Sequence, residues 1–386
     1  MIKIEKIIPG GQALGTDDTG KKIFFWNALP GEIVTEYEIT KNKSHYSEAT
    51  ATAINNESKY RTVPKDACFL STSPWQSIDY NYELKLKQEL VVELFREHNI
   101  NISTPEIITD HKDYYYRNKM EYALYWDNET SRIHLAFHQR GSHRKIPITH
   151  SSIERPEIFS AATDIINNLN ACHEEARKYQ SILLRCNQDG EVSGGLFENG
   201  KPHPVFPNLT DIILSQKYSY SPNGFFQINL PVYELALQEI KKHITTDKVL
   251  DLYAGVGTIG LSVARDRELT LVECDKSAYT ESLNNINGLN NVISILDKSE
   301  NIINNIAPDQ TIILDPPRAG CDAKLISKLI EVKPAKIIYL SCNPATQARD
   351  VKNLLAAYQI ENIKTFNFFP HTPHIENLII LRKIDK

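Results

Sequence analysis

The segment YLSCNPATQARD (339–350) places a cysteine, Cys342, where a strand is expected to end. The apolar residues 337–340 predict a buried strand, and Pro344 ends it before a helical pattern begins. A cysteine in this place can be a small apolar member of the core. It can also do chemistry, because open α/β sheets bind ligands outside the carboxyl ends of their strands. The other motifs of the sequence distinguish between these two interpretations.

A glycine-bearing turn is predicted in LDLYAGVGTIGL (250–261), between a strand and the start of a helix. Its glycines at 255, 257 and 260 fit the G-x-G-x-x-G pattern, in which the backbone can approach a ligand closely. Nicotinamide, flavin and methyl-donor enzymes share this pattern. Asp251 near the end of the first strand, and Glu273 at the end of the next, where an acid can bind ribose hydroxyls, favour S-adenosylmethionine over a dinucleotide.

A carboxylate followed by a rigid turn ends a further predicted strand, in the segment DPPRAG (315–320). The two prolines alone are explained by a turn. At the carboxyl edge of a sheet, however, Asp315 and a fixed backbone can also orient a planar heterocycle. Methyltransferases that act on bases commonly carry such a D/N-P-P segment.

From about residue 247 the sequence alternates between buried strands and helices, which predicts a doubly wound, mainly parallel sheet. Two last strands, IENIKTFNFF and ENLIILRKI, have no helix between them and predict an antiparallel pair at one edge of that sheet. Residues 1–60 predict a small barrel of short strands divided by Gly, Pro and Asp-Asp turns. Residues 77–98 predict one amphipathic helix.

The segment HKDYYYRNKMEYALYW (111–126) concentrates cations and tyrosines. It predicts either strand packing or a surface where cations hold phosphates and aromatic rings stack on bases. The formal net charge of −5 over 386 residues gives no global attraction to nucleic acid, so RNA binding would need a local patch of this kind.

Six cysteines without a C-x-x-C pair argue against a zinc knuckle and a disulfide framework, and suit a reducing cytoplasm. No apolar run approaches the roughly 20 residues of a membrane span. We therefore expect a cytoplasmic protein without a membrane partner, and a monomer.

Together these motifs resemble those of the RNA (uracil-5-)-methyltransferases. The segments that carry the resemblance are SPNGFFQIN (221–229), LDLYAGVGTIGL, VECD, ILDPPRAG, YLSCNPATQARD and PHTPHIENLIIL (370–381), with YYYRNKMEYAL in the family's central domain and GGQALG, ALPGE and YSEATATAI in its TRAM domain. The resemblance covers nearly the whole chain. It implies an OB-like TRAM barrel that binds RNA (1–60), a mixed α+β central RNA-recognition domain (61–220) and a Rossmann-like class I methyltransferase domain (221–386), on which the helix 77–98 would pack.

The family's mechanism gives the cysteine a role. A thiolate adds to C6 of uracil, C5 takes the methyl group of S-adenosylmethionine, and a base removes the C5 proton before the thiol leaves. The resemblance implies that Cys342 is the nucleophile, Glu376 the general base and Asp315 a further catalytic residue. It also implies donor-binding positions at Gln227, Asp251, Tyr253, Gly255, Gly257, Thr258, Glu273, Asp297 and Asp315, and RNA-binding positions at Phe225, Gln227, Tyr116, Arg117 and Lys119.

One feature of the family is missing from the sequence. Many members bind a [4Fe–4S] cluster through four cysteines, but here the first region holds only Cys68, and Ser151 stands about where the fourth ligand is expected. Iron–sulfur clusters need a nearly complete set of thiolates. We therefore predict no cluster and no other metal.

Two other functions stay open at this point. A cytosine-5 methyltransferase also uses a thiol that attacks C6, although usually in a Pro-Cys context. An inactive RNA-binding or ribosome-assembly factor could retain the motifs, although it would not need Cys342, Asp315 and Glu376 together. For the substrate we favour 23S ribosomal RNA over transfer RNA, by family analogy alone.

Overall fold

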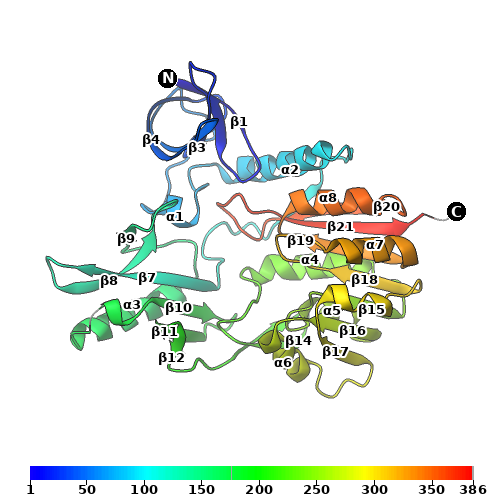
Figure 1. Ribbon diagram of the computed structural model, residues 1–386. Coiled ribbons are helices and arrows are strands. Elements are labelled where there is room, and N and C mark those ends of the chain that lie inside the picture. The colour runs from blue at the N-terminus through cyan, green and yellow to red at the C-terminus, as the bar shows by residue number, and fades with distance from the viewer. Residues whose placement is uncertain (175, 385–386) are drawn as a thin grey trace.

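The computed structural model describes residues 1–174 and 176–384. Figure 1 shows three regions: an N-terminal barrel, a central sheet with one long helix, and a large α/β region that holds the C-terminus. We call the last one the catalytic region, because the predicted catalytic residues Cys342, Asp315 and Glu376 belong to it, and its eight-stranded sheet the catalytic sheet. The α/β architecture with a small N-terminal barrel, predicted from the sequence, is confirmed.

The barrel is closed, with the strand order β1-β2-β3-β5-β4. Its strands are β1 (Ile2–Ile7), β2 (Ala13–Thr16), β3 (Lys22–Trp26), β4 (Ile33–Asn42) and β5 (Tyr46–Asn55). Along β1, Ile2 and Ile4 are buried while Lys3 and Glu5 are exposed, as the period of two in a strand requires.

A linker with two helices follows, α1 (Phe69–Thr72) and α2 (Tyr80–Glu97). The side chain of Asp79 caps α2 by accepting a hydrogen bond from the backbone N–H of Tyr82 at 3.0 Å. Helix α2 packs against α8 (Pro344–Leu354), and its Leu86 and Leu90 share one core with the barrel and the catalytic sheet. The predicted helix 77–98 therefore packs on the catalytic region.

The central region is a six-stranded antiparallel sheet in the order β12-β11-β10-β7-β8-β9, on which α3 packs. Its core contains the buried Tyr122, Ile158 and Ile182. Its elements are β7 (Lys119–Asp127), β8 (Arg132–His138), β9 (Lys145–Pro147), α3 (Pro156–Ala171), the 3-10 turn η1 (Ala176–Lys178), β10 (Ser181–Cys186), β11 (Val192–Glu198) and β12 (Lys201–His203).

The catalytic region is built on an eight-stranded sheet in the order β17-β16-β15-β18-β19-β21-β20-β6. Helices α2, α7 and α8 lie in the core on one face, and α4, α5 and the hairpin β13–β14 in the core on the other. The elements are β13 (Leu209–Ile213), β14 (Gln216–Tyr220), α4 (Leu230–Lys242), β15 (Lys248–Leu252), α5 (Thr258–Ala264), β16 (Glu268–Glu273), α6 (Lys276–Asn285), β17 (Val292–Leu296), η2 (Ser299–Asn301), η3 (Ile303–Asn305), β18 (Gln310–Leu314), α7 (Ala323–Val332), β19 (Lys336–Ser341), β20 (Tyr358–Phe366) and β21 (Glu376–Lys383).

The last two strands differ in one respect from the prediction. They are antiparallel, as expected, but β20 is not at the edge, because β6 (Glu106–Ile108) pairs with it in parallel. A strand of three residues is too short to show a recognisable alternation. Three elements between residues 61 and 220, namely α2, β6 and the β13–β14 hairpin, thus lie in the catalytic region. The exact domain boundaries stay a prediction.

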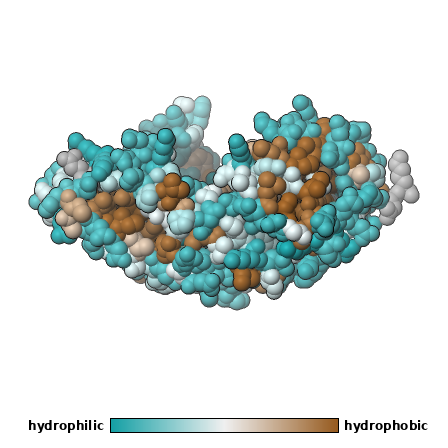
Figure 2. All heavy atoms as spheres, turned by 90° about the horizontal axis from the view of Figure 1, so that it is seen from below, coloured by the Kyte–Doolittle hydropathy of each residue, from teal (hydrophilic) through white to brown (hydrophobic). Residues whose placement is uncertain are grey.

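The surface mixes polar and apolar side chains. Figure 2 shows two apolar areas on the face seen from below, one on the side of the central sheet and one on the side of the catalytic sheet, with hydrophilic side chains between them. Exposed large apolar residues include Val205 and Ile293. Among the described residues, no helix is both long and apolar enough to cross a membrane.

Candidate active site

One large cavity, of about 1800 Å³, lies at the carboxyl ends of the parallel strands. Three neighbouring strands, β18, β19 and β21, bring the predicted catalytic residues to its wall. Asp315 follows the last residue of β18, Cys342 follows that of β19, and Glu376 is the first residue of the antiparallel β21. The chain therefore gathers at one place three side chains that are far apart in the sequence.

The thiol of Cys342 is only partly buried. The side chain of Asn343 caps α8 by accepting from the backbone N–H of Ala345, and Pro344 opens that helix. Burial and then the carboxyl groups of Glu376 and Asp315 raise the pKa of Cys342 to about 11, and Arg318 opposes them. The thiol is accessible but protonated in the free protein.

Burial also shifts both carboxyl groups toward their neutral forms. Burial raises the pKa of Glu376 well above its ordinary value, and the Asp315 carboxyl acts in the same direction. Burial raises the pKa of Asp315 to about 7. Strongly perturbed groups that line a cavity are typical of functional sites.

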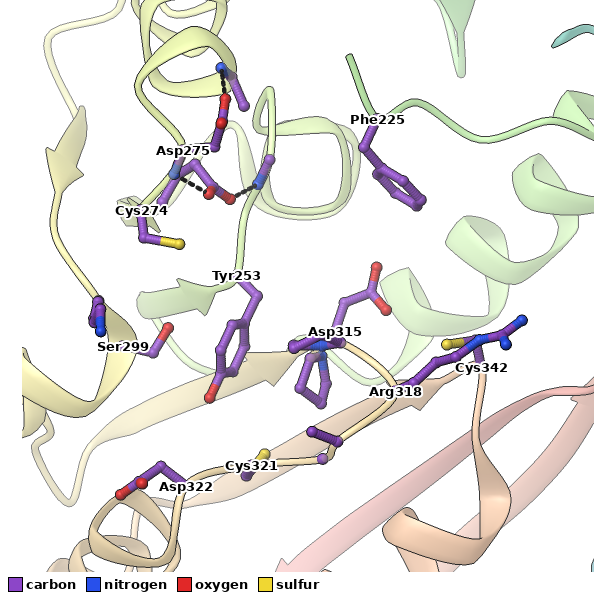
Figure 3. A pocket seen from close by; sticks show the side chains of 18 of the residues that line it. Phe225, Tyr253, Cys274, Asp275, Ser299, Asp315, Arg318, Cys321, Asp322 and Cys342 are labelled. Carbon is purple, nitrogen blue, oxygen red and sulfur yellow. Dashed lines mark hydrogen bonds between the residues drawn. The ribbon is translucent and has the colours of Figure 1, made fainter. Parts of the chain in front are cut away.

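Arg318 and His374 stand beside these groups, and the sequence analysis assigned a role to neither. Figure 3 shows Arg318 reaching along the cavity wall to Cys342. Its Nη2 lies 3.4 Å from Nδ1 of His374, and its carbonyl oxygen accepts from Asn343 Nδ2 at 2.8 Å. Desolvation and then the Arg318 charge lower the pKa of His374, so this ring is neutral near pH 7. Both residues lie inside the motifs DPPRAG and PHTPHIEN, which were the available signal.

At the other end of the cavity, Glu273 closes the glycine turn. Its Oε2 accepts from Gly255 N–H at 2.8 Å and its Oε1 from Asp275 N–H at 2.6 Å, as the dashed lines in Figure 3 show. Gly255 has φ +57°, and a Cβ placed there would meet no heavy atom within 4 Å. An open space beside a glycine and a carboxylate at the end of β16 fit a nucleoside donor such as S-adenosylmethionine. Tyr253 and Asp297 also line this end of the cavity.

Three predicted donor-binding residues lie outside the cavity lining, behind the turn. Asp251 is fully buried, and its Oδ2 accepts from the N–H of Gly260 at 2.8 Å. Gly257 (φ +86°) and Thr258 begin the buried helix α5. These residues shape the turn and do not line the cavity, and their contact with a donor stays a prediction. A position at a strand end does not reveal to which face its side chain points.

The predicted RNA-binding residues divide in the same way. Phe225, Gln227 and Arg117 line the cavity, and Phe225 is 74% exposed and faces it from the opposite wall (Figure 3). Lys119 instead donates to the carbonyl oxygens of residues 223 and 224, and so supports the loop that carries Phe225. Tyr116 is 7% exposed and its hydroxyl donates to the Pro370 carbonyl oxygen at 3.0 Å. Its ring is therefore not available for stacking on a base.

At the position expected for the fourth cluster ligand, Ser151 takes part in a hydrogen-bonded network. Its hydroxyl donates to Glu154, whose other carboxyl oxygen accepts from Tyr122. Cys68 is buried nearby in the core of the central sheet. Within the described residues, no group of three or more His, Cys, Asp or Glu side chains is arranged to hold a metal ion.

Three comparisons place this site among known proteins. A family profile described as tRNA (Uracil-5-)-methyltransferase matches residues 214–384. A protein of Lactobacillus johnsonii, named as an uncharacterized RNA methyltransferase, is 28% identical over 429 residues, covering 95% of this chain and 94% of the relative. One of Prochlorococcus marinus with the same name is 28% identical over 422 residues, covering 92% and 99%.

Among solved structures, the tRNA (uracil-54, C5)-methyltransferase of Pyrococcus abyssi in complex with S-adenosyl-L-homocysteine superimposes with a TM-score of 0.76. The two chains are 23% identical, and the match covers 99% of this chain and all of the other. At this identity the match shows the shared fold. The family profile spans the strands and turns that form the cavity, so residues 214–384 are similar to the tRNA (Uracil-5-)-methyltransferases, and nearly the whole chain is similar to proteins named as RNA methyltransferases.

Proposed function

We propose that this protein methylates C5 of a uridine in structured RNA through a covalent bond between Cys342 and C6 of the base. The observation that carries the proposal is the cavity shared by a partly accessible thiol, Cys342, and two carboxyl groups, Glu376 and Asp315. A nucleophile and a base that act on one planar ring have to stand in one cavity. The uracil ring would enter the cavity between Phe225 and the wall formed by Cys342 and Arg318.

The thiolate is needed because C5 of uracil is a weak nucleophile. When Cys342 sulfur bonds to C6, the electron pair of the C5=C6 double bond moves onto C5. Bound S-adenosylmethionine supplies a methyl group on a positively charged sulfur, which C5 can take. Glu376 then accepts the C5 proton, the C5=C6 bond re-forms, and the C6–S bond breaks to release the thiolate.

Both acting groups have to lose a proton first, since Cys342 and Glu376 rest in their neutral forms. Arg318 is the side chain that lowers the pKa of both. Its guanidinium stands at the exposed side of the cavity, where it can also face the negative charge on the base after thiolate addition. We therefore assign Arg318 to electrostatic support of the adduct.

For the donor, we propose that Glu273 binds the ribose hydroxyls, and that Tyr253, Gly255 and Asp297 line the rest of its site. Asp315 and Gln227 line the same cavity as Cys342 and Glu273, and we propose that they orient the donor and the target base. Asp251, Gly257 and Thr258 act indirectly, by holding the glycine turn in shape.

The RNA substrate is the less defined part of the proposal. Ribosomal RNA, favoured by family analogy, stays our first expectation. Transfer RNA is the second candidate, because the Pyrococcus abyssi structure is named as a tRNA (uracil-54, C5)-methyltransferase. Mapping 5-methyluridine in ribosomal and transfer RNA, from cells with and without the gene, distinguishes the two. If cells without the gene keep all 5-methyluridine in both RNAs, this result would contradict both substrate candidates.

The chemistry is tested with a labelled donor and RNA that contains 5-fluorouridine, whose fluorine cannot leave as a proton does. We expect the wild-type protein to be trapped as a protein–RNA band on a denaturing gel, and Cys342→Ala to form none. Cys172→Ala, which changes an exposed cysteine at the end of α3, is the matched control and should be trapped like wild type. Turnover of uridine by Cys342→Ala at nearly the wild-type rate would end the proposal, and labelling of cytosine-containing RNA would favour the cytosine-5 alternative.

A further inference from the structure

The connection between β20 and β21, residues 367–375, carries His374 and leads directly into Glu376. In Figure 1 it extends from the catalytic sheet toward the barrel and α1. A loop of this length would ordinarily be mobile and tolerant of change. Here it leads straight into Glu376, which pairs with Phe366 at the start of β21, so its attachments to the rest of the protein bear on the position of that carboxyl group.

Helix α2 holds this connection through a buried ion pair. Lys87 Nζ donates to Glu83 Oε1 at 2.7 Å, to Asn367 Oδ1 at 2.6 Å and to the Phe369 carbonyl oxygen at 3.0 Å, which uses all three of its N–H groups. Glu83 Oε2 accepts from the backbone N–H of His371 at 2.9 Å. Both side chains of the pair are 0% exposed. Such pairs often add little to stability, which points to a role in fixing geometry.

The other parts of the chain attach to the same connection. From the central region, the Tyr116 hydroxyl donates to the Pro370 carbonyl oxygen at 3.0 Å. From the linker, the backbone N–H of Trp75 donates to the His371 carbonyl oxygen at 3.0 Å. From the barrel, Gly11 lies so close that a Cβ there would stand 2.1 Å from Cβ of Pro373. Barrel, linker, central region and α2 therefore meet on one stretch of backbone.

We propose that Glu83, Lys87 and Tyr116 are positioning residues for the general base: they fix the 367–375 connection so that Glu376 reaches the C5 proton of the adduct. The inference rests on the proposed role of Glu376. A general base works when its acceptor atom lies about 2.6–3.2 Å from the heavy atom that carries the proton, or reaches it through one water. A misplacement of about 1 Å can cost about 100-fold in rate. Cys342 lies between β19 and α8 and makes none of these hydrogen bonds, so we expect formation of the adduct not to depend on them.

The proposal separates two steps that a general loss of stability would slow together. Tyr116→Phe removes one hydroxyl and leaves the ring in the core. In single-turnover experiments with uridine-containing RNA, we expect the methylated protein–RNA adduct to form at nearly the wild-type rate. Release of methylated RNA should be slower by roughly tenfold or more, so that the adduct accumulates on denaturing gels.

Tyr122→Phe is the matched control. Tyr122 is equally buried in the central region, and its hydroxyl also makes one hydrogen bond, to Glu154, but it does not contact the connection. We expect wild-type rates for both steps in this variant. Lys87→Met has a side chain of similar length but no charge. It should slow release of methylated RNA more strongly than Tyr116→Phe does. Melting temperature and affinity for S-adenosylhomocysteine are measured for every variant.

The positioning role would be overturned, and a structural one left, if Tyr116→Phe slowed adduct formation and release equally. The same conclusion would follow if Tyr122→Phe also formed the adduct at the wild-type rate but released methylated RNA slowly. Unchanged release from Tyr116→Phe would overturn the positioning role as well. A wild-type protein that is never trapped by 5-fluorouridine RNA would instead overturn the proposed function. The two failures are therefore distinguishable.

Discussion

Replacing Asp315 by asparagine should make the protein more stable and less active at once. The carboxyl group lies after the last residue of β18 on the cavity wall, and among the described residues no side chain or backbone group is hydrogen-bonded to it. Burial raises its pKa from the ordinary 3.8 to about 7. Folding near neutral pH therefore has to protonate a group that is ionised in the unfolded chain, and this opposes folding.

The raised pKa of Asp315 makes the free energy of unfolding depend on pH through proton linkage. Below pH 3.8 the carboxyl is neutral in both states and contributes nothing to the pH dependence. Between pH 3.8 and about 7 the unfolded state loses its proton while the folded state keeps it, so wild-type stability falls as pH rises, and it levels off above pH 7. At about 1.4 kcal/mol per pH unit, the upper limit is roughly 4 kcal/mol. Because the cavity admits water to the carboxyl, we expect roughly 1–3 kcal/mol for Asp315→Asn.

The assay is thermal unfolding of both proteins between pH 4 and 8, together with methyl transfer at pH 8. The stability difference should be near zero at pH 4 and grow to a plateau above pH 7, and turnover should be strongly reduced. Asp309→Asn is the matched control, since this aspartate lies just before β18 and is exposed, and its salt bridge with Lys248 holds its pKa below the ordinary value. An Asp315→Asn protein that melts below wild type at pH 7, or with a difference independent of pH, would refute the reasoning.

Three further predictions concern the same cavity and its surroundings. Arg318→Gln should move the rising limb of the pH–rate profile to higher pH, because Arg318 lowers the pKa of Cys342 and Glu376 and both must deprotonate; the shift should be under about one pH unit, since the side chain is exposed, and an unchanged limb would exclude this role. Glu273→Gln should weaken binding of S-adenosylhomocysteine by roughly 10- to 100-fold, the loss of about 1.5–3 kcal/mol from a charged hydrogen bond; titration calorimetry measures this, and wild-type affinity would remove Glu273 from the donor site. Purified protein should carry no iron, which elemental analysis and the absorption spectrum check; several iron atoms per chain would contradict the prediction.

The catalytic sheet was predictable from the sequence because parallel strands buried on both faces, such as β15, β18 and β19, are continuous apolar runs. The three-residue β6 was not, since nothing in Glu106–Ile108 distinguishes a strand from a loop. The placement of Cys342, Asp315 and Glu376 around one cavity agrees with the expectation from their motifs. Their roles in catalysis remain predictions.

Other site residues could not be placed from the sequence, for definite physical reasons. Asp251 and Glu273 are acids at the ends of the neighbouring strands β15 and β16, but Asp251 lies behind the glycine turn and Glu273 lines the cavity. Tyr116 was interpreted as an RNA contact because it lies among cations, whereas its partner, Pro370, is 254 residues away. In α2, Glu83 and Lys87 have the four-residue spacing of a solvent-exposed pair. They are buried because the connection before Glu376 covers them.

The buried polar groups of this protein fall into two classes that differ in their hydrogen bonding. Lys87 has a partner for each of its three N–H groups, and Glu83 accepts from Lys87 and from His371. The carboxyl of Glu376 is almost as buried, at 4% exposed, but no hydrogen bond joins it to another group within the described part of the chain, and its pKa is strongly raised. A buried charge with all its hydrogen bonds made resists movement, whereas a buried carboxyl without such partners rests protonated and can take the C5 proton only after it has been ionised. Hydrogen bonding therefore separates the residues that hold the site, such as Glu83 and Lys87, from those that react in it, such as Glu376. We expect substitutions of the first kind to change the position of the Glu376 carboxyl group. Substitutions of the second kind should change whether a proton is transferred at all.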